Sequence, residues 1–133
     1  MKKLIFLIVA SISLFANKGE MQILQPFSST CPKAWLDDMK TIAKSVEIVT
    51  VKSNKGIKRE VGVPVEIQSC NTSFLNDFVF EGNVPVKAIK EFFLSTPKDA
   101  IGLALPAAQN DKTIKTVYIF FDNEKYEEFG KYK

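Results

Sequence analysis

The chain has 133 residues, with 18 basic side chains against 15 acidic ones, two cysteines and no histidine. The absence of histidine excludes catalytic sites that need an imidazole, which covers Ser-His-Asp triads, Cys-His pairs and the zinc protease helix. The formal net charge of +3 is small, and part of it lies in the first three residues.

Residues 1–16 have the organisation of a secretory signal peptide. Lys2 and Lys3 form a short positive region, residues 4–14 are apolar apart from two serines, and Ala16 offers a small residue for cleavage before Asn17. The apolar run falls short of the roughly 20 residues that span a bilayer as a helix. We therefore expect cleavage, a periplasmic protein and no membrane span in the mature chain.

The mature chain, residues 17–133, has the length of a single domain. Losing Lys2 and Lys3 reduces the 18 basic residues to 16, against 15 acidic ones. A net charge near +1 gives no reason to expect a nucleic-acid partner. Exported proteins keep disulfides, so a Cys31–Cys70 bridge is the default expectation for the two cysteines.

The N-terminal part of the mature chain predicts a β-α-β unit. Residues 21–25 predict a strand, and a helix is expected to begin at Thr30 or Cys31, with Pro32 in its first turn. Its apolar face comprises Trp35, Met39, Ile42 and Val46. The β-branched run at 46–51 predicts a buried strand parallel to the first.

A basic segment follows at residues 52–59. We expect its charged side chains to form a solvated surface; they are Lys52, Lys55, Lys58 and Arg59. Residues 74–81 then have the composition of a strand, and Gly82-Asn83 predicts a turn.

The C-terminal part predicts one helix and a hairpin. A helix opens at Pro85 and closes at Thr96-Pro97, with an apolar side formed by Val86, Ile89, Phe92 and Phe93. Residues 117–121 and 126–132 predict two strands joined by a turn at 122–123. The whole pattern predicts an α/β domain with a mixed sheet and flanking helices.

The chemistry-bearing feature is sulfur at a helix start. A helix amino end favours a thiolate at Cys31, which is both a nucleophile and a soft-metal ligand. The position after a strand is that of the active-site cysteine in thioredoxin-like folds, but Ala34 occupies the place of the second cysteine of a Cys-x-x-Cys pair. With no other catalytic constellation, the motifs leave catalysis open and favour a protein that is not an enzyme.

Several blocks of the chain together resemble a known family. They are Gly-Val-Pro at 62–64, Gln-Ser-Cys-Asn-Thr at 68–72, Val-Phe-Glu-Gly-Asn-Val-Pro at 79–85, Ile-Gly-Leu-Ala-Leu-Pro at 101–106 and the strand at 117–122. In order and spacing they resemble a family of small exported bacterial metal-binding proteins, formerly of unknown function, that includes the copper-handling protein CopG. The resemblance implies a thioredoxin-like single domain over 17–133, a periplasmic location, and copper binding or copper resistance.

The resemblance also implies that most family metal ligands are replaced in this chain. Aligned on Trp35, a Cys-x-Cys-Cys motif falls on Ser29, Cys31 and Pro32, so that only Cys31 remains. A Ser-Cys-His-Thr motif keeps Cys70 and carries Asn71 in place of histidine, and Asn83 replaces a second histidine. The methionine of a later loop is absent from residues 107–110.

Two thiols, Cys31 and Cys70, therefore form the expected metal site, and Cu(I) is the ion that accepts two thiolates. The resemblance implies copper as the ligand and periplasmic copper-efflux or copper-oxidising proteins as partners. It also implies a proline with a cis peptide bond beside the site, for which Pro64 has the right place in the sequence.

Three functions remain open from the residues. The first is a periplasmic copper-binding or copper-resistance protein with Cys31 and Cys70 as a reduced pair, which the resemblance favours. The second is a thiol-redox module in which Cys31 attacks and Cys70 resolves the mixed disulfide. The third is a site-degenerate structural or interaction domain stapled by a disulfide.

Overall fold

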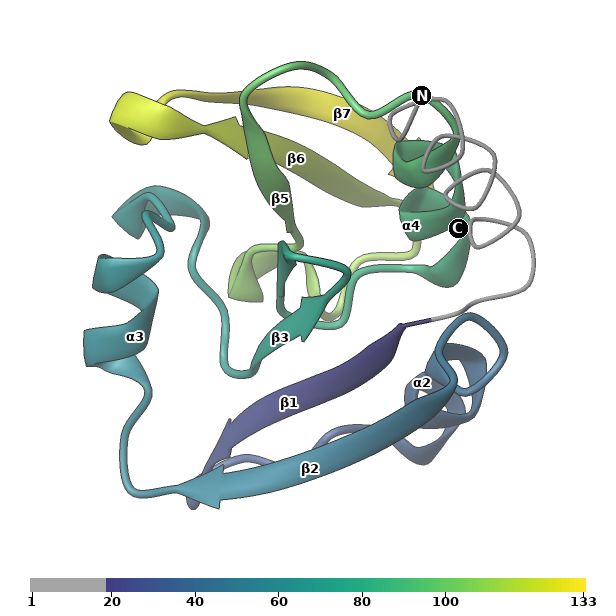
Figure 1. The fold of residues 1–133 in the computed structure, drawn as a ribbon, viewed down its shortest axis with the longest axis vertical. Coiled ribbons are helices and arrows are strands. Elements are labelled where there is room, and N and C mark those ends of the chain that lie inside the picture. The colour runs from purple at the N-terminus through teal and green to yellow at the C-terminus, as the bar shows by residue number, and fades with distance from the viewer. Residues whose placement is uncertain (1–18) are drawn as a thin grey trace, which may run out of the picture.

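The computed structural model describes residues 19–133, which form one mixed sheet of seven strands with helices on both of its sides (Figure 1). The predicted signal peptide lies outside the described residues. The strands are β1 (Glu20–Pro26), β2 (Ser45–Val51), β3 (Thr72–Leu75), β4 (Phe78–Glu81), β5 (Ala100–Ala104), β6 (Lys115–Phe121) and β7 (Tyr126–Tyr132). The helices are α2 (Lys33–Met39), α3 (Lys55–Glu60) and α4 (Val86–Leu94), with 3-10 turns at Val65–Ile67, Ala107–Gln109 and Asp122–Glu124.

The strand order across the sheet is β2-β1-β3-β4-β5-β6-β7. Two neighbouring pairs are parallel, β1 with β2 and β4 with β5, and each pair is joined by a segment that contains a helix, α2 or α4. The other four neighbouring pairs are antiparallel. The predicted α/β class and mixed sheet are confirmed.

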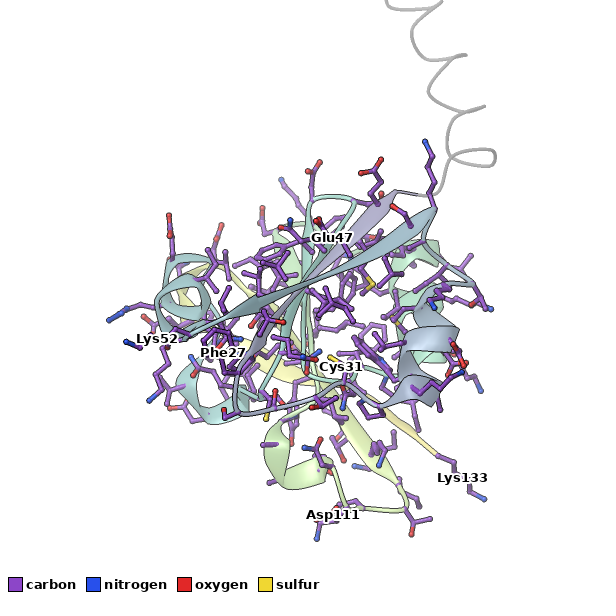
Figure 2. All side chains as sticks on the ribbon, turned by 90° about the horizontal axis from the view of Figure 1, so that it is seen from below. Phe27, Cys31, Glu47, Lys52, Asp111 and Lys133 are labelled. Carbon is purple, nitrogen blue, oxygen red and sulfur yellow. The ribbon has the colours of Figure 1, made fainter. Side chains whose placement is uncertain are left out.

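The sheet separates two apolar clusters. Helices α2 and α4 lie together on one side of the sheet and α3 lies on the other (Figure 1). Side chains alternate along the strands, so that Phe80 joins the larger cluster under α2 and α4 while Val79 joins the smaller one. Figure 2 shows Cys31 among the interior side chains of the larger cluster, whereas Asp111 and Lys133 extend from the surface.

The first helix is shorter than its apolar pattern predicts. It begins after Pro32, which is the cap residue, and ends at Met39. The amides of Thr41 and Ile42 then bond back three residues, to Asp38 and Met39, and the chain enters β2 at Ser45. Ile42 and Val46 were therefore placed wrongly in a helix, because strand pairing with β1 overrides helical periodicity at this point.

Strand β2 is parallel to β1 as predicted, but it is not buried. It lies at one edge of the sheet with β1 as its single strand neighbour. Most of its residues are exposed or half-exposed, and Ile48 is 41% exposed. A β-branched run predicts strand geometry, and it does not decide which faces of that strand are covered.

Residues 74–81 form a hairpin rather than one strand. Asn76 and Asp77 have φ of 51° and 69° and join β3 to β4 as a two-residue turn. Strand β5, at Ala100–Ala104, was not predicted as a strand. The helix at Val86–Leu94 and the final hairpin of β6 and β7 are confirmed.

Candidate functional site

A pocket of about 500 Å³ lies where four loops meet. These loops precede α2, precede β3, follow β4 and follow β5. Five residues that the sequence placed at the site line this pocket: Ser29, Pro32, Cys70, Asn71 and Asn83. The fold thus brings together positions that are more than fifty residues apart in the chain.

The pocket has one apolar wall and a charged rim. The wall includes Trp35, Pro85 and Leu105, and the charged lining residues are Asp38, Lys115 and Lys133. Trp35 is 7% exposed, and its indole N–H donates a hydrogen bond of 2.8 Å to the carbonyl of Val84. This bond links α2 to the loop that carries Asn83.

Cys31 does not line the pocket. It is 6% exposed and belongs to the larger apolar cluster, and its amide donates a 2.8 Å bond to the side-chain oxygen of Gln25. Burial, with a smaller electrostatic effect from Cys70, raises the pKa of the Cys31 thiol to about 11. The expectation of a thiolate at this position is therefore wrong, because desolvation outweighs any effect of the short helix that follows.

Cys70 is exposed, and both cysteines are free. The expected Cys31–Cys70 disulfide is not formed. The backbone carbonyl of Cys70 accepts hydrogen bonds from the Asn54 amide, at 2.7 Å, and from the Lys58 ammonium, at 3.1 Å. Buried polar groups thus hold the peptide of Cys70 while its thiol faces outward.

The ammonium of Lys58 is the centre of a buried polar network. Lys58 is 3% exposed and forms an ion pair with Glu81, which is fully buried. Its ammonium also donates to the hydroxyl of Thr72 at 2.8 Å, and with the bond to the Cys70 carbonyl all three of its donors are used. The prediction that Lys58 belongs to a solvated surface is therefore wrong.

The carboxylate of Glu81 accepts two further hydrogen bonds. One comes from the Thr72 hydroxyl, at 2.7 Å, and the other from the backbone amide of Ser69, at 2.8 Å. Glu81 therefore fixes both ends of the segment that carries Cys70 and Asn71. Sequence reasoning missed this role; the available signal was an ionisable residue at the end of an apolar strand, inside the Glu-Gly-Asn-Val-Pro block.

Two asparagine side chains of the pocket carry buried atoms without a partner. Asn71 is 3% exposed, and its Nδ2 makes no hydrogen bond with any described residue. The Oδ1 of Asn83 is also buried and unpaired within residues 19–133. A buried donor and a buried acceptor left open beside one pocket are costly unless a further group pairs with them.

Pro64 lies away from this pocket. No peptide bond among the described residues is cis, so the predicted cis bond at Pro64 is wrong. Pro64 instead precedes the 3-10 turn Val65–Ile67, and its carbonyl accepts the amide of Ile67 at 3.1 Å. The trans isomer is the lower-energy form of an X–Pro bond, and this turn is built on it.

Residues 19–133 contain no group of three or more His, Cys, Asp or Glu side chains placed to hold a metal ion. A closed zinc site, which needs four donors, does not fit this part of the chain. Cys31 and Cys70 are the two thiols of the chain, and no disulfide joins them. No helix within the described part of the chain is both long and apolar enough to span a membrane.

Comparison with known proteins gives one family match and two similar structures. The model of the family described as "Protein of unknown function, DUF411" matches residues 67–109, the segment that carries Cys70, Asn71, Glu81 and Asn83. No curated protein matches.

The similar structures are two forms of one protein. "Copper resistance protein copG- Form 1" has a TM-score of 0.67 and 18% identity, and the match covers 87% of this chain and 98% of that one. Form 2 has a TM-score of 0.67 and 19% identity, with 86% and 98% covered. Over residues 67–109 the chain is thus similar to the DUF411 family, and its fold is similar to that of a copper resistance protein.

Proposed function

We propose that this protein binds Cu(I) in the periplasm and contributes to copper resistance. The observation that carries the proposal is that Cys70, an exposed and free thiol, lines a pocket at the ligand positions of a fold shared with a copper resistance protein. Copper is the cargo here, and its partners would be periplasmic copper-efflux or copper-oxidising proteins.

The donor set fits Cu(I) better than a harder ion. Cu(I) accepts two thiolates, and the chain supplies Cys70 at the pocket and Cys31 in the larger apolar cluster. A two-thiolate site requires the Cys70 side chain to move toward Cys31, whose raised pKa means that the metal must displace a proton. We therefore expect Cu(I) affinity to increase with pH.

We also propose that the fold is thioredoxin-like. In support, the chain opens with β1, α2 and β2 as a parallel β-α-β unit, and Cys31 lies between β1 and the start of α2. The departure is the trans bond at Pro64.

The thiol-redox function is the second candidate, with the roles of the two cysteines exchanged. Because Cys31 is buried with a raised pKa, the attacking thiol is Cys70, and Cys31 is the resolving one. The disulfide-stapled domain is not favoured, because both cysteines are free.

The test is an anaerobic titration of the reduced protein with Cu(I) against a competing chelator. We expect Cys70→Ser and Cys31→Ser each to weaken binding by at least about tenfold, since each removes one of two ligands. Asn110→Ala, which changes a pocket residue that offers no soft donor, is the matched control and should bind as the parent does. Equal affinity of both serine variants and the parent would refute the site.

The location has its own test. The full chain is expressed in a Gram-negative bacterium, and the periplasmic fraction is analysed by intact mass. We expect a protein that begins at Asn17. Retention of Lys2 and Lys3 in the recovered protein would contradict the proposed signal peptide.

A further inference from the structure

The pocket beside Cys70 has the composition of a small-molecule site rather than that of a metal site alone. Its volume of about 500 Å³ is within the range of ligand pockets, and it combines the Trp35 and Leu105 wall with a few polar groups. A single metal ion needs far less space.

The unpaired atoms of the pocket define the chemistry of a ligand. Asn71 Nδ2 is a hydrogen-bond donor, so it cannot coordinate a cation, and it calls for an acceptor. Asn83 Oδ1 calls for a donor. A peptide group, which presents a carbonyl and an N–H, supplies one of each.

The rim adds a preference for negative charge. Of the charged side chains that line the pocket, two are basic, Lys115 and Lys133, and one is acidic, Asp38. The Lys115 ammonium donates hydrogen bonds to the carbonyls of Asn110 and Lys112, at 3.1 Å and 2.8 Å. These bonds orient the ammonium, and because both acceptors are neutral its positive charge is kept. An acidic ligand is favoured over a basic one.

The reactive group is the exposed thiol of Cys70. We infer that the pocket binds a small acidic peptide disulfide of the glutathione class and that Cys70 forms a mixed disulfide with it. The Cys70 thiolate attacks one sulfur, the ligand's S–S bond breaks, one half stays bonded to Cys70 and the other leaves as a thiolate. The proton of the Cys70 thiol goes to solvent, and the ligand disulfide is the oxidant.

This inference goes beyond copper binding and does not depend on it. The mixed disulfide with the ligand forms on Cys70 and not on Cys31, because Cys31 is 6% exposed and does not line the pocket. The reaction is measured with a metal chelator present, so a protein that fails to bind Cu(I) can still form the mixed disulfide. A protein that fails to form the mixed disulfide can likewise still bind Cu(I).

The experiment compares two disulfides on the same thiol. Reduced protein is incubated with oxidised glutathione or with bis(2-hydroxyethyl) disulfide, which is neutral and has no peptide group, and adducts are followed by intact mass and peptide mapping. The rate constant with oxidised glutathione is divided by the rate constant with bis(2-hydroxyethyl) disulfide. Because both reactions use the same thiol, its intrinsic nucleophilicity cancels in this ratio. The matched control is Ser95→Cys in a Cys70→Ser background, an exposed thiol beyond the end of α4 and outside the pocket.

We expect the parent to form one adduct, on Cys70, with a ratio about tenfold above that of the control thiol. Asn71→Ala and Asn83→Ala should each lower this ratio by about fivefold, the equivalent of one hydrogen bond. Lys115→Gln, on the rim, should lower it as well, and it tests the inference even where Asn71→Ala fails to fold. Equal ratios for the parent and the control, or an adduct on Cys31, would overturn the inference.

Discussion

Lys58 on α3 and Glu81 at the end of β4 form an ion pair in which both side chains are almost completely buried. The pair crosses from the helix on one side of the sheet to a central strand, and its hydrogen bonds reach Ser69, the Cys70 carbonyl and Thr72. Every Lys58 donor is satisfied. The buried ion pair therefore holds the segment from Ser69 to Thr72, which brings Cys70 to the pocket.

Breaking this pair from one side should be strongly destabilising. We expect Lys58→Met to lower the free energy of unfolding by about 3–5 kcal/mol, because it leaves the Glu81 carboxylate buried without its counter-ion. Urea unfolding measures the change. The control is Lys55→Met, an exposed lysine of the same helix. If the two variants lose the same stability, the ion pair is not important.

The two cysteines should differ in accessibility. In the folded protein, a thiol reagent such as iodoacetamide should modify Cys70 rapidly and leave Cys31 unmodified, because Cys31 is 6% exposed and largely protonated. In denaturant both should react. Peptide mapping identifies the site, and rapid labelling of Cys31 in the folded protein would contradict its placement in the core.

Stability should depend on pH through Cys31. Its pKa is raised from 9.0 to about 11, so folding favours the neutral thiol. This contribution is complete below pH 9 and is lost as the pH rises from about 9 to about 11. Urea unfolding of the reduced protein across this window should show a steeper loss than Cys31→Ala does; parallel curves would show that Cys31 carries no such contribution.

Gly82 should not tolerate a side chain. Its φ is +81°, and a Cβ would lie 2.5 Å from the Leu105 carbonyl and 2.8 Å from Cβ of Ser69. We expect Gly82→Ala to cost more than about 2 kcal/mol, from the left-handed backbone and the clash together. Gly56→Ala, where a Cβ meets nothing within 4 Å, is the control. Urea unfolding compares the two variants, and similar midpoints for Gly82→Ala and Gly56→Ala would contradict the prediction.

Trp35 is the single tryptophan and lies in the pocket wall. Trp35→Phe removes the hydrogen bond to the Val84 carbonyl and should destabilise the protein by about 1–3 kcal/mol, since a buried acceptor loses its donor.

In the parent protein, modification of Cys70 should change the fluorescence of Trp35, because both side chains line the same pocket. An unchanged emission spectrum after complete modification would contradict the shared pocket.

Local patterns predicted those elements whose boundaries are marked by turn and cap residues. The helix from Val86 has a proline before it and Thr96-Pro97 after it, and the last hairpin has Asp122-Asn123 at its turn. The prediction of a single strand over residues 74–81 is wrong because the turn inside this segment was not recognised. Asn76 and Asp77 accept positive φ and turn the chain inside a segment whose composition is that of one strand.

The candidate site was predicted in part. The resemblance placed Cys70, Asn71 and Asn83 at it, and all three line one pocket. The sequence did not predict the burial of Lys58, because a lysine among basic neighbours carries no local sign of burial. Only the register of α3 against β4 brings its ammonium to Glu81.

By itself, the sequence determined the α/β class and the lack of imidazole chemistry, and it limited the thiols to Cys31 and Cys70, because these follow from composition and local periodicity. The tertiary structure alone decided which sulfur is available. Packing of the sheet against α2 and α4 buries Cys31 and raises its pKa, while the Lys58–Glu81 network holds the Cys70 peptide at the pocket with its thiol exposed. Desolvation depends on what surrounds an atom from every direction, and no local run of residues specifies that.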